Sequence, residues 1–142
     1  MSRFTFRRFP PLARAYLLVA AADAVGVVLA VSGGLDGLGR AIGSGTPINA
    51  PIPFLVGQLA VAALAVTREG RRLGTVAAAL LAVLGTVSVL SGLGDGSFTT
   101  ALTAPERAVQ LAIVAATGLT VVLAVKQVVA ARRPQAAYRV SA

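Results

Sequence analysis

The chain has 142 residues, 56% of them hydrophobic, and a formal net charge of +8. A soluble domain of this size would have too little polar surface to cover itself, whereas a bilayer core of roughly 30 Å requires apolar runs of about 20 residues. Cysteine and histidine are absent, which excludes disulfides, thiol chemistry, imidazole ligation of haem and the usual zinc sites. We therefore expect a membrane protein without a metal or another cofactor.

Four apolar runs follow one another along the chain, at about 12–31, 51–66, 73–90 and 105–129. A segment within a bilayer must satisfy its own backbone hydrogen bonds, so each run is expected to be a helix. The second run is the shortest, and its Pro51 and Pro53 suit the first turn of a helix. We expect one all-α domain over residues 1–142, with four transmembrane helices and short basic tails at 1–11 and 130–142.

The basic residues predict the orientation of these helices. Eleven of the thirteen Lys and Arg residues lie in the two tails, at the flanks of the first and fourth runs, or between the second and third runs; the other two are Arg40 and Arg107. The positive-inside rule then places both termini in the cytoplasm, and basic residues beside spans argue against nucleic-acid binding. Aromatic residues near the ends of the runs are expected to form interfacial belts; they are Phe4, Phe6, Phe9 and Tyr16 on the cytoplasmic face and Phe54 and Phe98 on the outer face.

The N-terminal segment has an alternative interpretation as a cleaved signal peptide. It combines basic residues, an apolar stretch and the small residues Ala30 and Ser32. The apolar run is long for a signal peptide and has a counterpart later in the chain, so we favour a retained span. The abundance of Ala, Gly, Val and Arg is typical of GC-rich bacterial genomes, and we expect a bacterial cell membrane as the location.

An ordered series of short matches indicates an internal duplication. Ser-Gly-x-x-Asp-Gly occurs at 32–37 and 91–96, Ala-Pro at 50–51 and 104–105, and Gln-Leu-Ala at 58–60 and 110–112. These define two tandem helical hairpins, at about 12–67 and 73–129, that run in the same direction and form parallel repeats about an axis along the membrane normal. The alignment pairs Gly26 with Gly85 and Asp23 with Ala82.

Asp23 is the most informative polar residue because it lies near the middle of the first run. A carboxylate there costs roughly 2.5–3.5 kcal/mol on insertion scales, so such residues usually face a bundle interior. It either binds a proton or a cation, or it only forms a hydrogen bond with a neighbouring helix, and the sequence leaves both open. Gln58, Gln110 and Thr117 are further polar candidates; the two Gln are expected at equivalent depths, where they could meet near the pseudo-axis.

Three other charged residues are candidates near the outer face. Asp36 and Asp95 occupy the duplicated glycine-rich element, which is typical of a helix end and a turn. A cation site at an external mouth is the alternative, but it would need more oxygen ligands. Arg107 stands beside Glu106 at the start of the fourth run, where an interfacial ion pair is expected.

Nothing in the sequence resembles a nucleophile with a general base, so we do not expect an enzyme. The favoured function is an accessory or assembly component of the bacterial cell membrane, surrounded by lipid and associated with a membrane-protein partner or a second copy of itself. The alternative is a small proton- or cation-coupled carrier or channel that uses Asp23.

Overall fold

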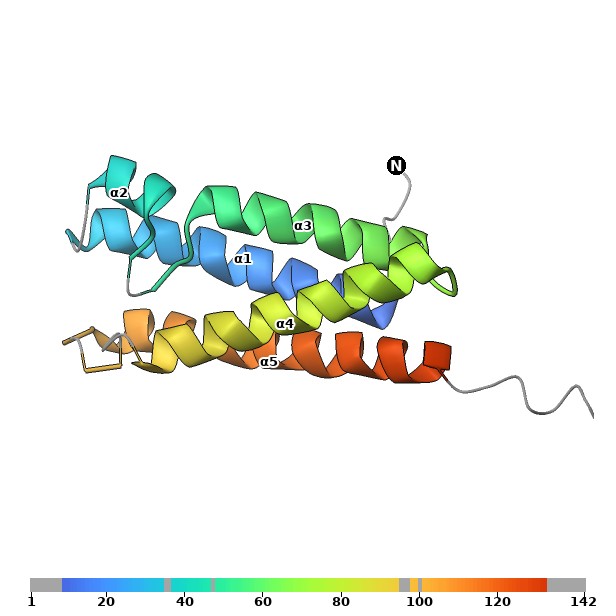
Figure 1. The fold of residues 1–142 in the computed structure, drawn as a ribbon. Coiled ribbons are helices and arrows are strands. Elements are labelled where there is room, and N and C mark those ends of the chain that lie inside the picture. Colours follow the sequence, from blue (N-terminus) through green and yellow to red (C-terminus); the bar gives the residue numbers. More distant parts are fainter. Residues whose placement is uncertain (1–8, 35–36, 47, 95–97, 100, 133–142) are drawn as a thin grey trace, which may run out of the picture.

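The structure is a computed structural model that describes residues 9–34, 37–46, 48–94, 98–99 and 101–132, and its elements are helices throughout. They are α1 (Pro11–Ser32), α2 (Leu38–Gly43), α3 (Ile52–Thr67), α4 (Arg72–Gly94) and α5 (Ala104–Arg132). The long helices alternate in direction, and α1 begins at the same end of the bundle at which α5 ends (Figure 1). The predicted all-α class is confirmed. Asp36 and Asp95 lie outside the described residues, so their roles stay predictions.

Helix length distinguishes α3 from the other long helices. The helices α1, α4 and α5 have 22, 23 and 29 residues and are apolar and long enough to cross a membrane. In contrast, α3 has 16 residues, which extend about 24 Å at 1.5 Å per residue and fall short of a roughly 30 Å bilayer core. Apolar helices of this kind are compatible with a membrane protein. Three candidate spans are therefore supported, and the fourth predicted span is not confirmed.

Local sequence accounts for where α1 and α5 begin and end. Beyond α1, Gly34 adopts a left-handed backbone with a φ of 72°, and the Gly33 N–H donates to the Leu29 carbonyl at 2.7 Å. This is the helix-ending role predicted for the Ser-Gly-Gly stretch. At the start of α5, the Thr103 N–H donates to Glu106 Oε2 at 2.6 Å, which is the backward bond of a capping box.

Small side chains fill one end of the bundle, near the α3–α4 connection. The residues of this alanine-rich core are Leu12, Tyr16, Ala62, Ala65, Ala77, Ala78, Leu81, Ala82 and Ala124. Small residues let helix backbones approach closely, which drives helix association in lipid. Tyr16 belongs to this core, and its hydroxyl donates to the Leu55 carbonyl at 2.9 Å. The prediction that Tyr16 anchors the protein at the interface is therefore wrong, because its side chain is buried between α1 and α3.

Residues 44–46 and 48–50, which we call the inserted segment, lie between α2 and α3 inside the bundle. The segment turns back on itself through an isolated antiparallel bridge between Thr46 and Asn49, and Ile48 and Asn49 are buried. It packs on Gly26 of α1, where a Cβ would overlap the Ile48 carbonyl oxygen. Non-helical backbone at this depth is tolerated in a membrane only where protein or a water-filled cavity surrounds it.

The inserted segment explains why α3 is short. The Ala50 N–H, just before α3, donates to Asp23 near the middle of α1, whereas Glu106, in the first turn of α5, lies against Gly33 beyond the end of α1. Ten residues of helix separate these two points on α1, which is about 15 Å. The two hairpins therefore begin their second helices at different depths, although their sequences align.

Candidate binding cavity around Asp23

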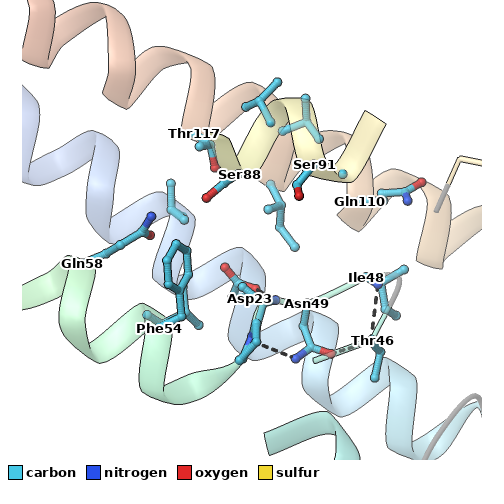
Figure 2. A pocket seen from close by; sticks show the side chains of 18 of the residues that line it. Asp23, Thr46, Ile48, Asn49, Phe54, Gln58, Ser88, Ser91, Gln110 and Thr117 are labelled. Carbon is cyan, nitrogen blue, oxygen red and sulfur yellow. Dashed lines mark hydrogen bonds between the residues drawn. The ribbon is translucent and has the colours of Figure 1, made fainter. Parts of the chain in front are cut away.

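A cavity of about 440 Å³ lies in the half of the bundle that contains the inserted segment. The inserted segment, α1, α3, α4 and α5 all contribute to its wall, and Figure 2 shows their side chains around it. The lining includes all the polar intramembrane candidates predicted from the sequence, which are Asp23, Gln58, Gln110 and Thr117. Residues from three different helices, up to 94 positions apart, thus share one site.

Asp23 has two carboxylate oxygens in different situations. Oδ1 accepts a hydrogen bond from the Ala50 N–H at 2.7 Å, so it joins α1 to the backbone that precedes α3. Oδ2 is buried and has no hydrogen-bond partner, and the side chain as a whole is only 1% exposed. A buried carboxylate oxygen without a partner is unfavourable by about 1–3 kcal/mol or more. The structural interpretation of Asp23, a hydrogen bond between helices, therefore concerns Oδ1. The functional interpretation, binding of a proton or a cation, concerns Oδ2.

Further polar groups stand around the carboxylate. Gln58, on α3, is 6% exposed, and Ser88, on α4, donates its hydroxyl proton to the Leu84 carbonyl at 2.8 Å, which leaves the hydroxyl oxygen able to accept. Gln110 is held from outside the cavity, because its Oε1 accepts from an Arg107 guanidinium nitrogen at 2.7 Å. The cavity wall thus offers amide and hydroxyl groups at several places.

The two glutamines line the cavity from different depths. Each lies six residues after the first residue of its helix, but α3 begins beside Asp23 and α5 begins beside Gly33. Figure 2 accordingly shows Gln58 and Gln110 on opposite sides of Asp23. The equivalent depth expected from the duplication is therefore not found, because the inserted segment moves the start of α3 toward the middle of the bundle.

Apolar side chains make up much of the rest of the wall. Among them are Phe54 and Phe98, which the sequence assigned to an interfacial belt because each lies near the end of an apolar run. Sequence reasoning also missed Ile48 and Asn49, since they occur in a glycine-rich stretch that resembles an external loop. The only available signal was the pair Asn49 and Pro51 immediately before an unusually short apolar run.

Arg107 and Glu106 have separate partners in the structure. Glu106 accepts from the Thr103 backbone as part of the α5 cap, and Arg107 contacts Gln110 and lies 5.8 Å from the centre of the Phe98 ring. Both Arg107 contacts are with residues that line the cavity. Within the described residues, no group of three or more Asp, Glu, His or Cys side chains could hold a metal ion.

Comparison with known protein families, with curated proteins and with solved structures found no match for this chain.

Proposed function

We propose that the chain crosses a bacterial cell membrane four times with both termini in the cytoplasm. The charge distribution supports this orientation, and the inserted segment gives the short α3 additional length across the bilayer. The matched series of motifs supports an origin by duplication of a hairpin. In this arrangement the cavity lies in the outer half of the membrane, and the alanine-rich core lies in the cytoplasmic half.

We further propose that the protein is a small carrier that binds its cationic substrate, or a coupling proton, at Asp23. The observation that supports this function is that Asp23 lines the cavity and that its Oδ2 atom is buried without a hydrogen-bond partner. A proton or a cation placed there would supply the missing partner. The Oδ1 bond to Ala50 fixes the position of the carboxylate, and because Oδ2 is covered in this structure, a ligand must displace a neighbouring group to reach it.

The accessory or assembly function favoured by the sequence needs no internal cavity. It stays a prediction, and so does association with a membrane partner or with a second copy of the chain. Copurification of a stoichiometric partner after mild solubilisation, together with absence of flux, would favour the accessory function over the carrier.

Reconstituted proteoliposomes test the carrier function. Fluxes of protons, sodium, potassium and two organic cations, tetramethylammonium and benzylammonium, are compared between wild-type protein, Asp23→Asn and liposomes without protein. Asparagine keeps an acceptor for the Ala50 N–H but removes the charge, so the variant is expected to fold and to lose a flux that the wild type shows. Equal flux in the variant and the wild type, or no wild-type flux above empty liposomes for any of these ions, would contradict the proposal.

A matched control uses a second carboxylate of the same chain. Glu106 caps α5 and does not belong to the cavity wall. Glu106→Gln removes one negative charge, as Asp23→Asn does, and is expected to leave the flux unchanged. Loss of flux in both variants would indicate a general effect of charge or folding, and would remove the specific support for Asp23.

A further inference from the structure

We infer that the ligand of the Asp23 cavity is an organic monocation, specifically a protonated amine that carries a compact apolar group. This inference deepens the proposed function, on which it rests, by naming the class of ligand. It follows from three properties of the cavity, namely a lining carboxylate with one unpartnered oxygen, a volume far larger than a bare ion, and a wall that combines apolar and amide groups.

The available carboxylate oxygen indicates a ligand that donates hydrogen bonds and carries positive charge. Asp23 Oδ2 is an acceptor without a partner, and an ammonium group presents three donors on one positive centre. In the proposed complex one of those donors bonds to Oδ2 once the ligand has displaced the groups that cover this atom, and further acceptors, the Ser88 hydroxyl oxygen and the Gln58 carbonyl, belong to residues of the same wall. Hydrogen bonds between ionised partners are roughly twice as strong as neutral ones.

The small number of anionic side chains and the large volume of the cavity argue against a metal ion as the bound ligand. Divalent cations in proteins require several oxygen ligands at short distances, and the described residues contain no cluster of three acidic, histidine or cysteine side chains. The cavity of about 440 Å³ is within the range of roughly 300–1,000 Å³ that is usual for small-molecule sites. Such sites are mostly apolar with a few polar groups that orient the ligand.

The apolar part of the wall indicates an apolar body on the ligand. Phe54 lies on the α3 side, and Phe98 lies toward the outer end, where Arg107 covers its ring. Because a guanidinium already occupies a face of Phe98, Phe54 is the better candidate for contact with the ligand's apolar group. Aromatic contacts with a bound ring stabilise the complex beyond the burial of apolar area.

Isothermal titration calorimetry in detergent micelles tests the ligand class with three probes. Benzylammonium chloride supplies the proposed cation, benzyl alcohol supplies the same ring without charge, and sodium chloride supplies an inorganic cation. The wild type is expected to bind benzylammonium roughly ten- to a hundredfold more tightly than benzyl alcohol. In Asp23→Asn the preference should disappear, while Glu106→Gln should retain it.

A second variant tests the apolar contact separately. Phe54→Ala is expected to weaken benzylammonium binding roughly two- to tenfold and to leave methylammonium binding unchanged, because methylammonium has no ring. Equal binding of benzylammonium and benzyl alcohol by the wild type would overturn the inference, and so would Asp23-dependent binding of sodium without binding of benzylammonium. If a variant does not fold, the relative affinities of the wild type for benzylammonium, benzyl alcohol and sodium decide whether the inferred ligand class is correct.

The binding experiment tests the ligand class and the flux experiment tests the carrier function, so either proposal can be contradicted while the other stands. Binding of benzylammonium without any flux of the tested ions would support the ligand class and contradict the carrier. A sodium or proton flux that depends on Asp23, without benzylammonium binding, would support the carrier and overturn the ligand class.

Discussion

Replacement of Gly26 by alanine should destabilise the protein by displacing the inserted segment. A Cβ at position 26 would overlap the Ile48 carbonyl oxygen, and this neighbour is backbone, which cannot rotate away. Overpacking of this kind typically costs about 1–3 kcal/mol, and a shift of the segment would also weaken the bond between Asp23 and Ala50. Alanine improves helix propensity by up to about 1 kcal/mol, so we expect a net loss of about 1–2 kcal/mol.

The aligned position in the second hairpin supplies the control. A Cβ at Gly85 would lie 2.6 Å from a methyl group of Val121 on α5, so this side chain must also shift, but no backbone has to move out of the way, and the same gain in helix propensity applies. We expect the free energy of unfolding of Gly85→Ala to lie within about 1 kcal/mol of the parent protein. The two variants are thus matched in substitution, in helix type and in aligned position, and they differ in what the new methyl group meets.

Thermal unfolding in detergent can measure this difference through an introduced cysteine, because the chain has none of its own. Leu81 is 2% exposed in the alanine-rich core, so a Leu81→Cys thiol reacts with a fluorogenic maleimide only after unfolding. The melting temperature of Gly26→Ala should fall clearly below that of Gly85→Ala in this background. Equal melting temperatures, or a lower one for Gly85→Ala, would refute the packing of the inserted segment on α1.

Three further predictions concern the remaining contacts and the orientation. Asp23→Leu should lower the melting temperature more than Asp23→Asn, because leucine leaves the buried N–H that precedes α3 without an acceptor, a loss of about 1–3 kcal/mol; equal melting temperatures would contradict this bond. Tyr16→Phe should lower the free energy of unfolding by about 0.6 kcal/mol, the average for hydrogen bonds between membrane helices. An unchanged melting temperature in this variant would contradict a stabilising bond between the Tyr16 hydroxyl and the Leu55 carbonyl. In intact cells, a membrane-impermeant maleimide should label Ser44→Cys directly and Thr67→Cys only after permeabilisation, whereas the reverse pattern would invert the proposed orientation.

The helices could be predicted closely from the sequence, because long apolar runs leave the backbone few alternatives in lipid. The expected span at 12–31 became Pro11–Ser32, and the expected span at 105–129 became Ala104–Arg132. The polar candidates were also found, since the energetic penalty of placing Asp23 or Gln58 in an apolar run is visible without a structure. Their convergence on one cavity was not visible, because it depends on how three helices pack.

The inserted segment could not be predicted, for two physical reasons. Its glycine and proline content is typical of an exposed loop, and its burial depends on the bond between Asp23 and Ala50, which are 27 residues apart. The predicted duplication made the prediction worse here, because it implied equal starting depths for α3 and α5. Aligned residues such as Gly26 and Gly85 have different neighbours, because Gly26 faces the backbone of the inserted segment and Gly85 faces a side chain of α5.

The composition of the alanine-rich core determines how the cavity could open toward the basic end of the bundle. Alanine has no side-chain rotamers, so this barrier contains few groups that could swing aside as a gate. Permeation would instead require whole helices to rock or slide past one another. The short connection at Arg68–Arg71 restrains α3 against α4, and α5 packs extensively on both α1 and α4, so such a motion would occur where α1 meets α3, which is the least extensive contact between the paired long helices.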